Sequence, residues 1–320
     1  MIDKQNLPCD DFTHQTVLLH ETVDAVLGGC QNASGVFVDA TFGRGGHSQL
    51  LLDYLADDAR LLVFDKDPQA IKTAQYLANH DSRVLVVHDS FANLATHLKQ
   101  LDIPLVDGIL ADLGVSSPQL DDGSRGFSFM RDGMVDMRMD TTRGQSVGQW
   151  LATVDEETLA NVLYEYGEDR RIAKAIKQMD NYDSTLKLAE VIKAAHPAWQ
   201  KGKHPATQSF QALRIFINNE LGDIKTFLNQ SLTHLKPNGH LAVISFHSLE
   251  DRLIKQFLNN HSRGKWDGDD QLLIAPKRTK YFDKPKRISP SLDEIQRNPR
   301  ARSAYLRAAR RNDAPIIDVL

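Results

Sequence analysis

Four acidic residues stand where chemistry is expected, each at the end of a short β-branched run. The runs are Val36–Asp39, Leu61–Asp65, Val84–Asp89 and Val106–Asp112. Helix-length amphipathic stretches at roughly 47–56, 69–79 and 91–100 separate them, a pattern typical of a parallel sheet flanked by helices. Because ligands of such sheets lie beyond the carboxyl ends of the strands, we expect these acids to face a bound small molecule.

A glycine-rich loop, Asp39-Ala40-Thr41-Phe42-Gly43-Arg44-Gly45-Gly46-His47, joins the first run to its helix. Its glycines let the backbone approach a ligand, and the start of the helix offers free N–H groups. The dehydrogenase fingerprint Gly-x-Gly-x-x-Gly/Ala fits imperfectly, because Ser48 occupies its last position. Taken alone, the loop is equally consistent with a tight turn.

Asp65 strengthens the ligand interpretation. It lies 26 residues after Asp39, where a carboxylate can accept both ribose hydroxyls of an adenosine. The alternative is a cap on the helix that begins at Pro68, although Asp67 is better placed for that. After the third run, Asp89-Ser90-Phe91 places a polar acceptor and an aromatic ring where an adenine would lie. These features together predict an adenosine-bearing cofactor.

The strand–helix alternation stops after Asp112 for about a hundred residues and resumes near 223. We expect a core of 1–115 and 223–320, the second part with a basic C-terminal stretch, interrupted by a helical insert at 116–222. The helices expected in the insert are Val147–Ala152, Glu156–Gly167, Asp169–Met179, Leu186–Ala195 and Thr207–Leu221. Beyond it we expect a helix end and tight turn at Leu235–Gly239, a strand at His240–Phe246 and a helix at Leu249–Leu258. Gln271–Ala275 and Ser303–Ala308 are weaker strand candidates, the latter antiparallel.

The loop, the segment Asp112-Leu113-Gly114-Val115-Ser116-Ser117-Pro118-Gln119 and the turn at Leu235–Gly239 resemble motifs of the class I S-adenosylmethionine-dependent methyltransferases. Asn238 stands where those enzymes often have glycine. At closer range, from about His14 to Arg311, the chain resembles the bacterial ribosomal RNA small subunit methyltransferase H family, also called MraW. The other blocks that carry the resemblance are His14–Leu19, Arg125–Phe129, Asp136–Asp140, His204–Thr207, Ser245–Arg252 and Asn298–Ser303.

The resemblance implies a class I, Rossmann-like α/β core with a mostly parallel seven-stranded sheet and an inserted helical domain for substrate recognition. It implies S-adenosyl-L-methionine as the cofactor and methylation of the exocyclic N4 amine of a cytidine in the decoding region of small-subunit (16S) ribosomal RNA. The cofactor contacts that carry over are Gly45, Gly46, His47, Asp65, Phe91, Asp112 and Gln119.

Cytosine N4 is a poor nucleophile because its lone pair is conjugated into the ring, whereas a sulfonium is a strong electrophile. The protein must therefore align the groups more than supply a powerful base. We expect Asp112 to position the cofactor or the amine. His247 could hold the base or relay a proton, although it lies at a plausible helix start with Ser248, Glu250 and Asp251.

Phe127 and Phe129 are the candidates for stacking on the cytosine, and packing within the insert's own core is their alternative. Arg214 shares a polar helix face with Gln211 and Asn218 that could grip RNA, or Arg214 could instead bond Glu220. Arg300 and Arg302 belong to the segment 277–311, which holds 12 Lys and Arg against three acids. We expect a phosphate grip there, and a solvated tail is the alternative.

Composition sets the outer limits. The net charge of −4 divides into −10 over residues 1–260 and +6 over 261–320, so RNA contact over a limited face is expected, as on an assembled or assembling 30S particle. No signal peptide or membrane span is apparent, which predicts a cytoplasmic protein with no membrane partner. Cys9 and Cys30 suggest neither a disulfide scaffold nor a zinc ribbon, and no metal is expected. A homodimer is left open. A catalytically silent RNA-binding assembly factor and, with less support, a nicotinamide-dependent dehydrogenase are the alternative functions.

Overall fold

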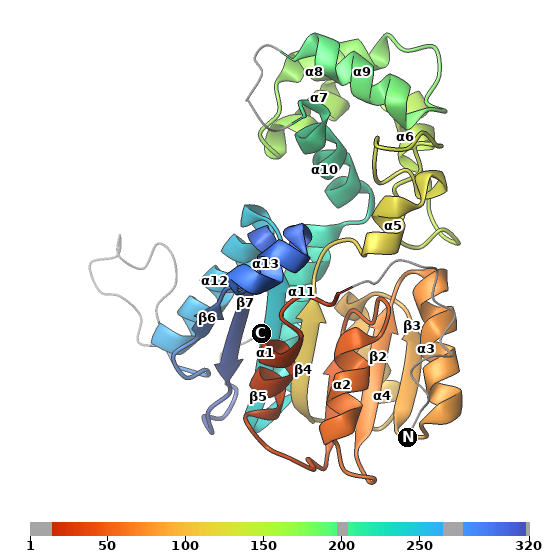
Figure 1. Cartoon of the computed structure of the whole chain (residues 1–320). Coiled ribbons are helices and arrows are strands. Elements are labelled where there is room, and N and C mark those ends of the chain that lie inside the picture. The colour runs from red at the N-terminus through yellow and green to blue at the C-terminus, as the bar shows by residue number, and fades with distance from the viewer. Residues whose placement is uncertain (1–14, 197–203, 265–277, 318–320) are drawn as a thin grey trace, which may run out of the picture. The chain divides into compact units, whose positions relative to one another are not determined.

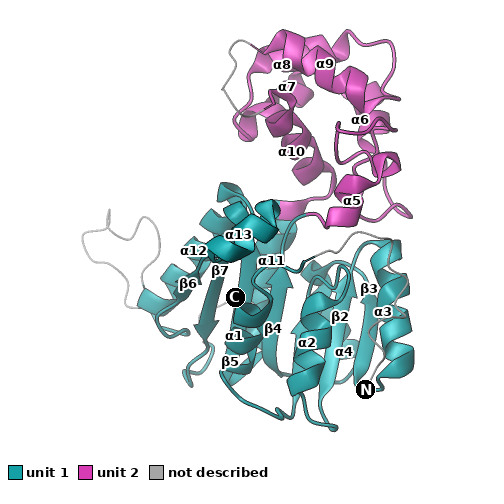
Figure 2. Ribbon diagram, viewed as in Figure 1, with its two compact units in different colours: residues 1–114, 221–320 teal, residues 115–220 magenta. Residues whose placement is uncertain are grey.

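The computed structural model describes residues 15–196, 204–264 and 278–317, and it divides the chain into two compact units (Figure 2). Residues 1–114 and 221–320 form unit 1, and residues 115–220 form unit 2. The sequence-based bounds of the insert were 116 and 222. Each unit has its own hydrophobic core, so each is described by itself.

Unit 1 is built on a seven-stranded sheet with the order β3-β2-β1-β4-β5-β7-β6 (Figure 1). The strands are β1 (Val36–Asp39), β2 (Arg60–Asp65), β3 (Val84–His88), β4 (Val106–Asp112), β5 (Leu235–Ser245), β6 (Lys286–Ile288) and β7 (Tyr305–Arg310). Strands β1 to β5 are parallel to one another, and β7 is antiparallel to both β5 and β6. The predicted α/β fold with a mostly parallel seven-stranded sheet is therefore confirmed.

The helices of unit 1 connect these strands and cover both faces of the sheet. They are α1 (Leu19–Leu27), α2 (Gly46–Tyr54), α3 (Pro68–His80), η1 (Phe91–Asn93), α4 (Leu94–Gln100), α11 (Glu220–His234), α12 (Ser248–Arg263), α13 (Leu292–Arg297) and η4 (Pro299–Ser303). Along β2, Leu61 and Val63 enter one buried cluster while Leu62 and Phe64 enter the other. This alternation is the pleat of a strand buried on both sides.

Unit 2 packs its helices around a third buried cluster, which includes Trp150, Leu163, Ile176 and Leu213. The elements are α5 (Ser117–Asp121), η2 (Gly123–Arg125), α6 (Val147–Thr153), α7 (Glu156–Glu165), α8 (Arg170–Lys177), α9 (Thr185–Ala195) and α10 (Ala206–Ile217). One predicted helix, Thr207–Leu221, is too long. The chain leaves α10 through Asn219, whose φ of 52° is left-handed, and α11 begins at Glu220.

The predicted helix end before Gly239 is confirmed, because α11 ends at His234, whereas the predicted tight turn at Leu235–Gly239 was wrong because these residues belong to β5. Leu235 and His240 both pair with β4, opposite Val106 and Gly108, so the residues between them form an irregularity within β5. Asn238 has a φ of 69°, a conformation that explains a residue such as Gly or Asn here. Neighbouring β4 therefore overrides the local turn signal.

The remaining weak strand candidates had different outcomes. Ser303–Ala308 overlaps β7 and is antiparallel as expected. Gln271–Ala275 lies outside the described residues. Among the helices of the described residues, none has both the length and the apolar character needed to span a membrane.

Candidate active site

The glycine-rich loop runs from β1 to α2, and hydrogen bonds to Asp39 hold both of its ends. Asp39 is fully buried, and its carboxylate accepts hydrogen bonds from Thr41 N at 3.0 Å and from Ser48 Oγ at 2.6 Å. Burial raises the pKa of this carboxyl to about 6. Asp39 thus shapes the loop rather than facing a ligand, which corrects the expectation for this strand end.

Two glycines of the loop have left-handed backbones, with a φ of 56° at Gly43 and 78° at Gly45. A Cβ on Gly45 would lie 2.6 Å from the ring of Phe42, so the protein itself requires glycine there. A Cβ on Gly43 would meet nothing closer than Thr41 O at 4.0 Å. The backbone at Gly43 therefore borders open space, as a loop that closely approaches a ligand must.

Asp65 ends β2 beside this loop. Its Oδ2 accepts a hydrogen bond from Gly43 N and its Oδ1 accepts one from Asp67 N, both at 2.8 Å. Burial raises its pKa to about 6. The helix-cap alternative for Asp65 is taken by Asp67, whose side chain accepts from Gln69 N at the start of α3. Each Asp65 oxygen retains acceptor capacity for a ribose hydroxyl.

Asp89 and Phe91, which follow β3, have different structural roles. Asp89 accepts hydrogen bonds from Ser90 N, Asn93 Nδ2 and His97 Nε2, which together outweigh burial and lower the pKa of its carboxyl. Asp89 thus holds the turn into η1. Phe91 packs edge-on against Phe227 with ring centroids 5.1 Å apart and is only partly buried. Its ring therefore has a face available to a planar ligand.

Asp112 ends β4, and its backbone N–H donates to the hydroxyl of Thr41 in the glycine-rich loop. The side chain is 24% exposed, with Oδ2 3.8 Å from Nδ1 of the buried His47. Its Oδ1 is buried and accepts no hydrogen bond from the described residues. Burial, with the nearby carboxylates of Asp39 and Glu250, raises the pKa of Asp112 well above its usual value.

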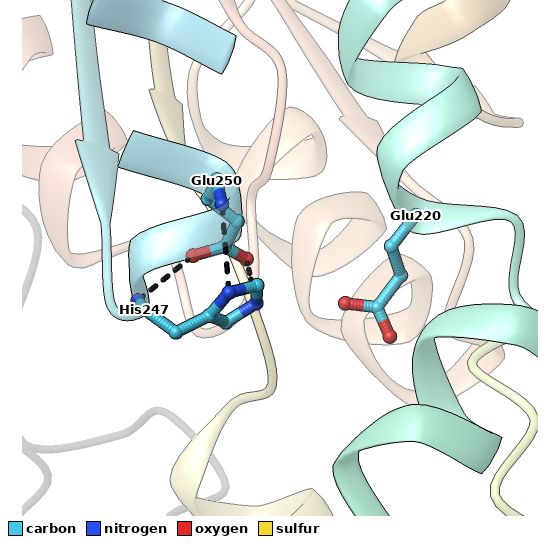
Figure 3. Close-up of side chains that lie close together, drawn as sticks. All are labelled: Glu220, His247 and Glu250. Atoms are coloured by element: carbon cyan, nitrogen blue, oxygen red, sulfur yellow. Dashed lines mark hydrogen bonds and ion pairs between the residues drawn. The ribbon is translucent and has the colours of Figure 1, made fainter. Parts of the chain in front are cut away.

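His247 and Glu250 lie after β5, where they form the start of α12 (Figure 3). The imidazole Nδ1 accepts from Glu250 N at 3.5 Å, while Glu250 Oε2 accepts from Phe246 N at 2.8 Å and His247 N at 3.3 Å. This reciprocal arrangement is a capping box with histidine in place of the usual serine or threonine. The structure gives His247 a helix-capping role, and its catalytic role stays a prediction.

The predicted site residues of unit 2 mostly contact other residues of the same unit. Gln119 accepts from Ser116 N at 2.9 Å in the capping box of α5. Phe127 is 6% exposed within the core, and the ring of Phe129 lies 4.9 Å from that of Phe210. The core-packing alternative therefore describes Phe127, and the partly buried Phe129 is the better stacking candidate.

Arg214 does not present a free guanidinium to RNA. It is 13% exposed and forms a bidentate pair with Glu220, at 2.8 Å for both contacts. Asn218, on the same predicted polar face, donates to Met137 O and accepts from Met139 N. The helix is amphipathic as the sequence indicated, but its polar side chains bind other residues of unit 2. The predicted RNA contact of Arg214 is therefore replaced by a structural role.

Fewer basic side chains are available to bind phosphates than the number of lysines and arginines suggested. Arg307 pairs with Asp251, Arg310 with Asp283, and Arg287 stacks on Tyr305. Arg300 and Arg302 are exposed on η4. Lys277 lies outside the described residues. Arg300 and Arg302 therefore stay in the proposal.

Sequence reasoning missed three residues that shape the site. Thr41 links the glycine-rich loop to Asp112, Ser48 binds Asp39, and Glu250 holds the loop after β5. The only available signal was at Glu250, which lies three residues after His247 in a capping-box spacing. The sequence offered no reason to assign a hydrogen bond to either hydroxyl.

The sheet order, the glycine-rich loop and the acids at its carboxyl edge define a class I methyltransferase core. The chain belongs to the MraW methylase family, whose model matches residues 11–312. It is 67% identical to ribosomal RNA small subunit methyltransferase H of Psychrobacter cryohalolentis, over 96% of this chain and 94% of that protein. The protein of the same name from Acinetobacter baylyi is 53% identical, over 94% of this chain and 99% of its own length. The crystal structure of an rRNA methylase from Streptococcus thermophilus is similar with a TM-score of 0.40 and 12% identity, over 94% of this chain and 99% of that chain.

Proposed function

We propose that this methylase transfers a methyl group from S-adenosylmethionine to the exocyclic N4 amine of a cytidine in the decoding region of small-subunit ribosomal RNA. Support for the RNA comes from the names of relatives that are 53–67% identical over nearly their whole length. The observation that carries the chemistry is Asp112, a partly exposed acid at the end of β4 with one buried oxygen that no described donor reaches.

The residues present suit this cofactor. Gly43 leaves the backbone open, and Asp65 has acceptor capacity for the ribose. Phe91 offers part of a ring for the adenine. We place Gly45, Gly46 and His47 in the same loop contact and assign Gln119 as a further contact. When bound, the cofactor supplies a methyl group activated by its sulfonium.

Asp112 is suited to act on the amine. Its Oδ1 would accept a hydrogen from N4, which localises the lone pair on nitrogen and fixes the direction in which it points. A carboxyl with a raised pKa also takes up a proton more readily than an ordinary aspartate as the amine becomes positively charged. His47 and Thr41 hold this side chain and its backbone in place.

We assign Phe129 to stacking on the target base, and Arg300 and Arg302 to phosphates on the RNA strand. An assembled or assembling small-subunit particle is the proposed form of the substrate, in the cytoplasm where small subunits form. A homodimer is compatible with this proposal but is not required by it.

Transfer of tritium from methyl-labelled S-adenosylmethionine to small subunits that lack the modification tests the proposal. We expect label in the ribosomal RNA, and less of it when S-adenosylhomocysteine competes. Binding of small subunits with no transfer of label would contradict the proposal and favour the silent assembly factor.

A further inference from the structure

The segment Gln15–Leu18, here called the N-terminal strap, lies against the glycine-rich loop. A Cβ built on Gly46 would fall 2.0 Å from Thr16 Oγ1 and 3.0 Å from Thr16 Cβ. The Thr16 side chain therefore occupies the space above the first residue of α2. Val17 and Leu18 are buried beside it in the same hydrophobic cluster as Phe42 of the loop.

The N-terminal strap precedes α1 and is not itself part of a helix or strand. Leu18 is the N-cap residue of α1, has no side-chain cap bond and adopts a left-handed φ of 50°. This conformation is unfavourable for a non-glycine residue, so it persists only where the surroundings impose it. Other parts of the chain must supply that restraint.

Two side chains from the C-terminal region anchor the strap. Glu294 of α13 accepts a hydrogen bond from Leu18 N at 2.8 Å, and Asn298 donates from Nδ2 to Gln15 O at 3.0 Å. These contacts join residues 276 and 283 positions apart in the chain. A hydrogen bond to a carboxylate is stronger than one between neutral groups, so Glu294 is the firmer of the two anchors.

Glu294 is the third residue after the N-cap of α13, a position at which a glutamate usually accepts a hydrogen bond from the backbone of its own cap residue. Ser291 caps α13 by accepting from Glu294 N, and in a capping box the glutamate would return a bond to the backbone of the cap. Here the carboxylate instead binds the strap. Asn298 similarly divides its amide, since Oδ1 accepts from Arg300 N while Nδ2 reaches Gln15.

We propose that Glu294 and Asn298 are positioning residues for the cofactor loop. By fixing the backbone of Gln15 and Leu18, they hold Thr16 on Gly46 and keep the loop between β1 and α2 in the conformation that receives the cofactor. This inference rests on the proposed function for the identity of the cofactor, but not for the coupling between α13, the strap and the loop.

The test compares Glu294→Ala, Glu294→Gln and Asn298→Asp with the unmodified protein. Glutamine keeps an oxygen that can accept from Leu18 N, so it should rescue the alanine defect. Asn298→Asp keeps the acceptor for Arg300 N, removes the donor to Gln15 O and adds a negative charge that repels this carbonyl. Asp293→Ala, which removes an exposed acid from the same helix, is the matched control.

Hydrogen–deuterium exchange of the ligand-free protein is the first measurement. We expect faster exchange in peptides that cover the strap and residues 40–49 in Glu294→Ala and Asn298→Asp, with no change in Asp293→Ala. Faster exchange in the strap with unchanged exchange at residues 40–49 would overturn the proposal. Asn298→Asp keeps the test valid if Glu294→Ala does not fold.

Cofactor affinity is the second measurement, by titration with S-adenosylhomocysteine and by the KM for S-adenosylmethionine. Both constants should rise about three- to tenfold in Glu294→Ala, the range expected for one hydrogen bond, while kcat at saturation is kept. An equal loss in Glu294→Gln, or a fall in kcat with unchanged KM, would overturn the positioning role. No binding of S-adenosylhomocysteine to the unmodified protein would instead refute the proposed cofactor and leave the exchange result to decide the coupling.

Discussion

Buried carboxylates at the carboxyl edge of the sheet differ in how many donors reach them. Asp39 and Asp89 receive donors at both oxygens, whereas Asp112 has a buried oxygen that no described donor reaches. An unsatisfied buried acceptor costs free energy in the ligand-free protein, so a ligand donor can recover that energy on binding. This difference is the reason why we propose Asp112, rather than Asp39 or Asp89, as the acid that acts on the substrate.

Asp112→Asn is expected to lower kcat about 10²- to 10³-fold, since it removes the charge that stabilises the developing positive amine while preserving shape. The fold should stay intact, because a buried carboxyl with a raised pKa does not stabilise the native state by its charge. Steady-state kinetics and thermal unfolding check both expectations. Near-normal turnover in Asp112→Asn would remove this residue from the reaction.

Asp39 predicts a pH dependence of stability. Its folded pKa of about 6 exceeds the ordinary aspartate value of 3.8, so the folded protein binds the proton more tightly than the unfolded chain. Protonated Asp39 therefore stabilises the folded state, by up to roughly 3 kcal/mol for a pKa difference of about two. This stabilisation is fully present below pH 3.8 and is lost as the pH rises through 6. Asp39→Asn should therefore weaken the fall in unfolding free energy between pH 4 and 6.5, measured by urea titration. Asp65 shares this window, so part of the slope should persist, and an unchanged slope would show that Asp39 does not titrate there.

At the scale of elements, the sequence predicted β1 to β4 well because each of these strands reads as a short apolar run. Elements that depend on distant partners were missed. Short β6 exists by pairing with β7, and α1 begins at a left-handed leucine rather than at a polar cap. The acids were located correctly, but which of them face a ligand depends on donors such as Thr41 and Ser48 that no spacing reveals.

The glycine-rich loop predicts that two equivalent substitutions have different effects. Gly45→Ala places a Cβ against Phe42, so it should lower stability by about 2 kcal/mol or more. Gly43→Ala meets no protein atom, so it should cost about 1 kcal/mol yet weaken S-adenosylhomocysteine binding more than tenfold. Thermal unfolding and isothermal titration separate the two effects. Normal affinity in Gly43→Ala would show that the ligand does not approach this backbone.

The short helix η4 predicts an electrostatic contribution to RNA binding. Replacing Arg300 and Arg302 by alanine should weaken binding and reduce the slope of log K against log salt by about 0.7 for each lost phosphate contact. Arg310→Ala is the control, because Arg310 is already paired with Asp283. Binding titrations between 50 and 200 mM salt, roughly the range used for such slopes, provide the measurement. An unchanged slope would assign both arginines to structure.

At the scale of the whole molecule, the chain combines a unit built on the seven-stranded sheet with a helical unit that has an independent core. The core was predictable in outline because strand–helix alternation is a local signal. The roles of Phe127 and Arg214 were not, since an inward and an outward side chain have the same helical spacing. Functional assignment in unit 2 therefore rests on fewer residues, chiefly Phe129, than in unit 1.

The most direct test is to locate the transferred methyl group by mass spectrometry on small-subunit ribosomal RNA treated with the protein and S-adenosylmethionine. We predict one added methyl on the N4 atom of a cytidine in the decoding region, and far less of it in the same reaction time with Asp112→Asn. A methyl group on a carbon atom, on a ribose or on another base would contradict this prediction.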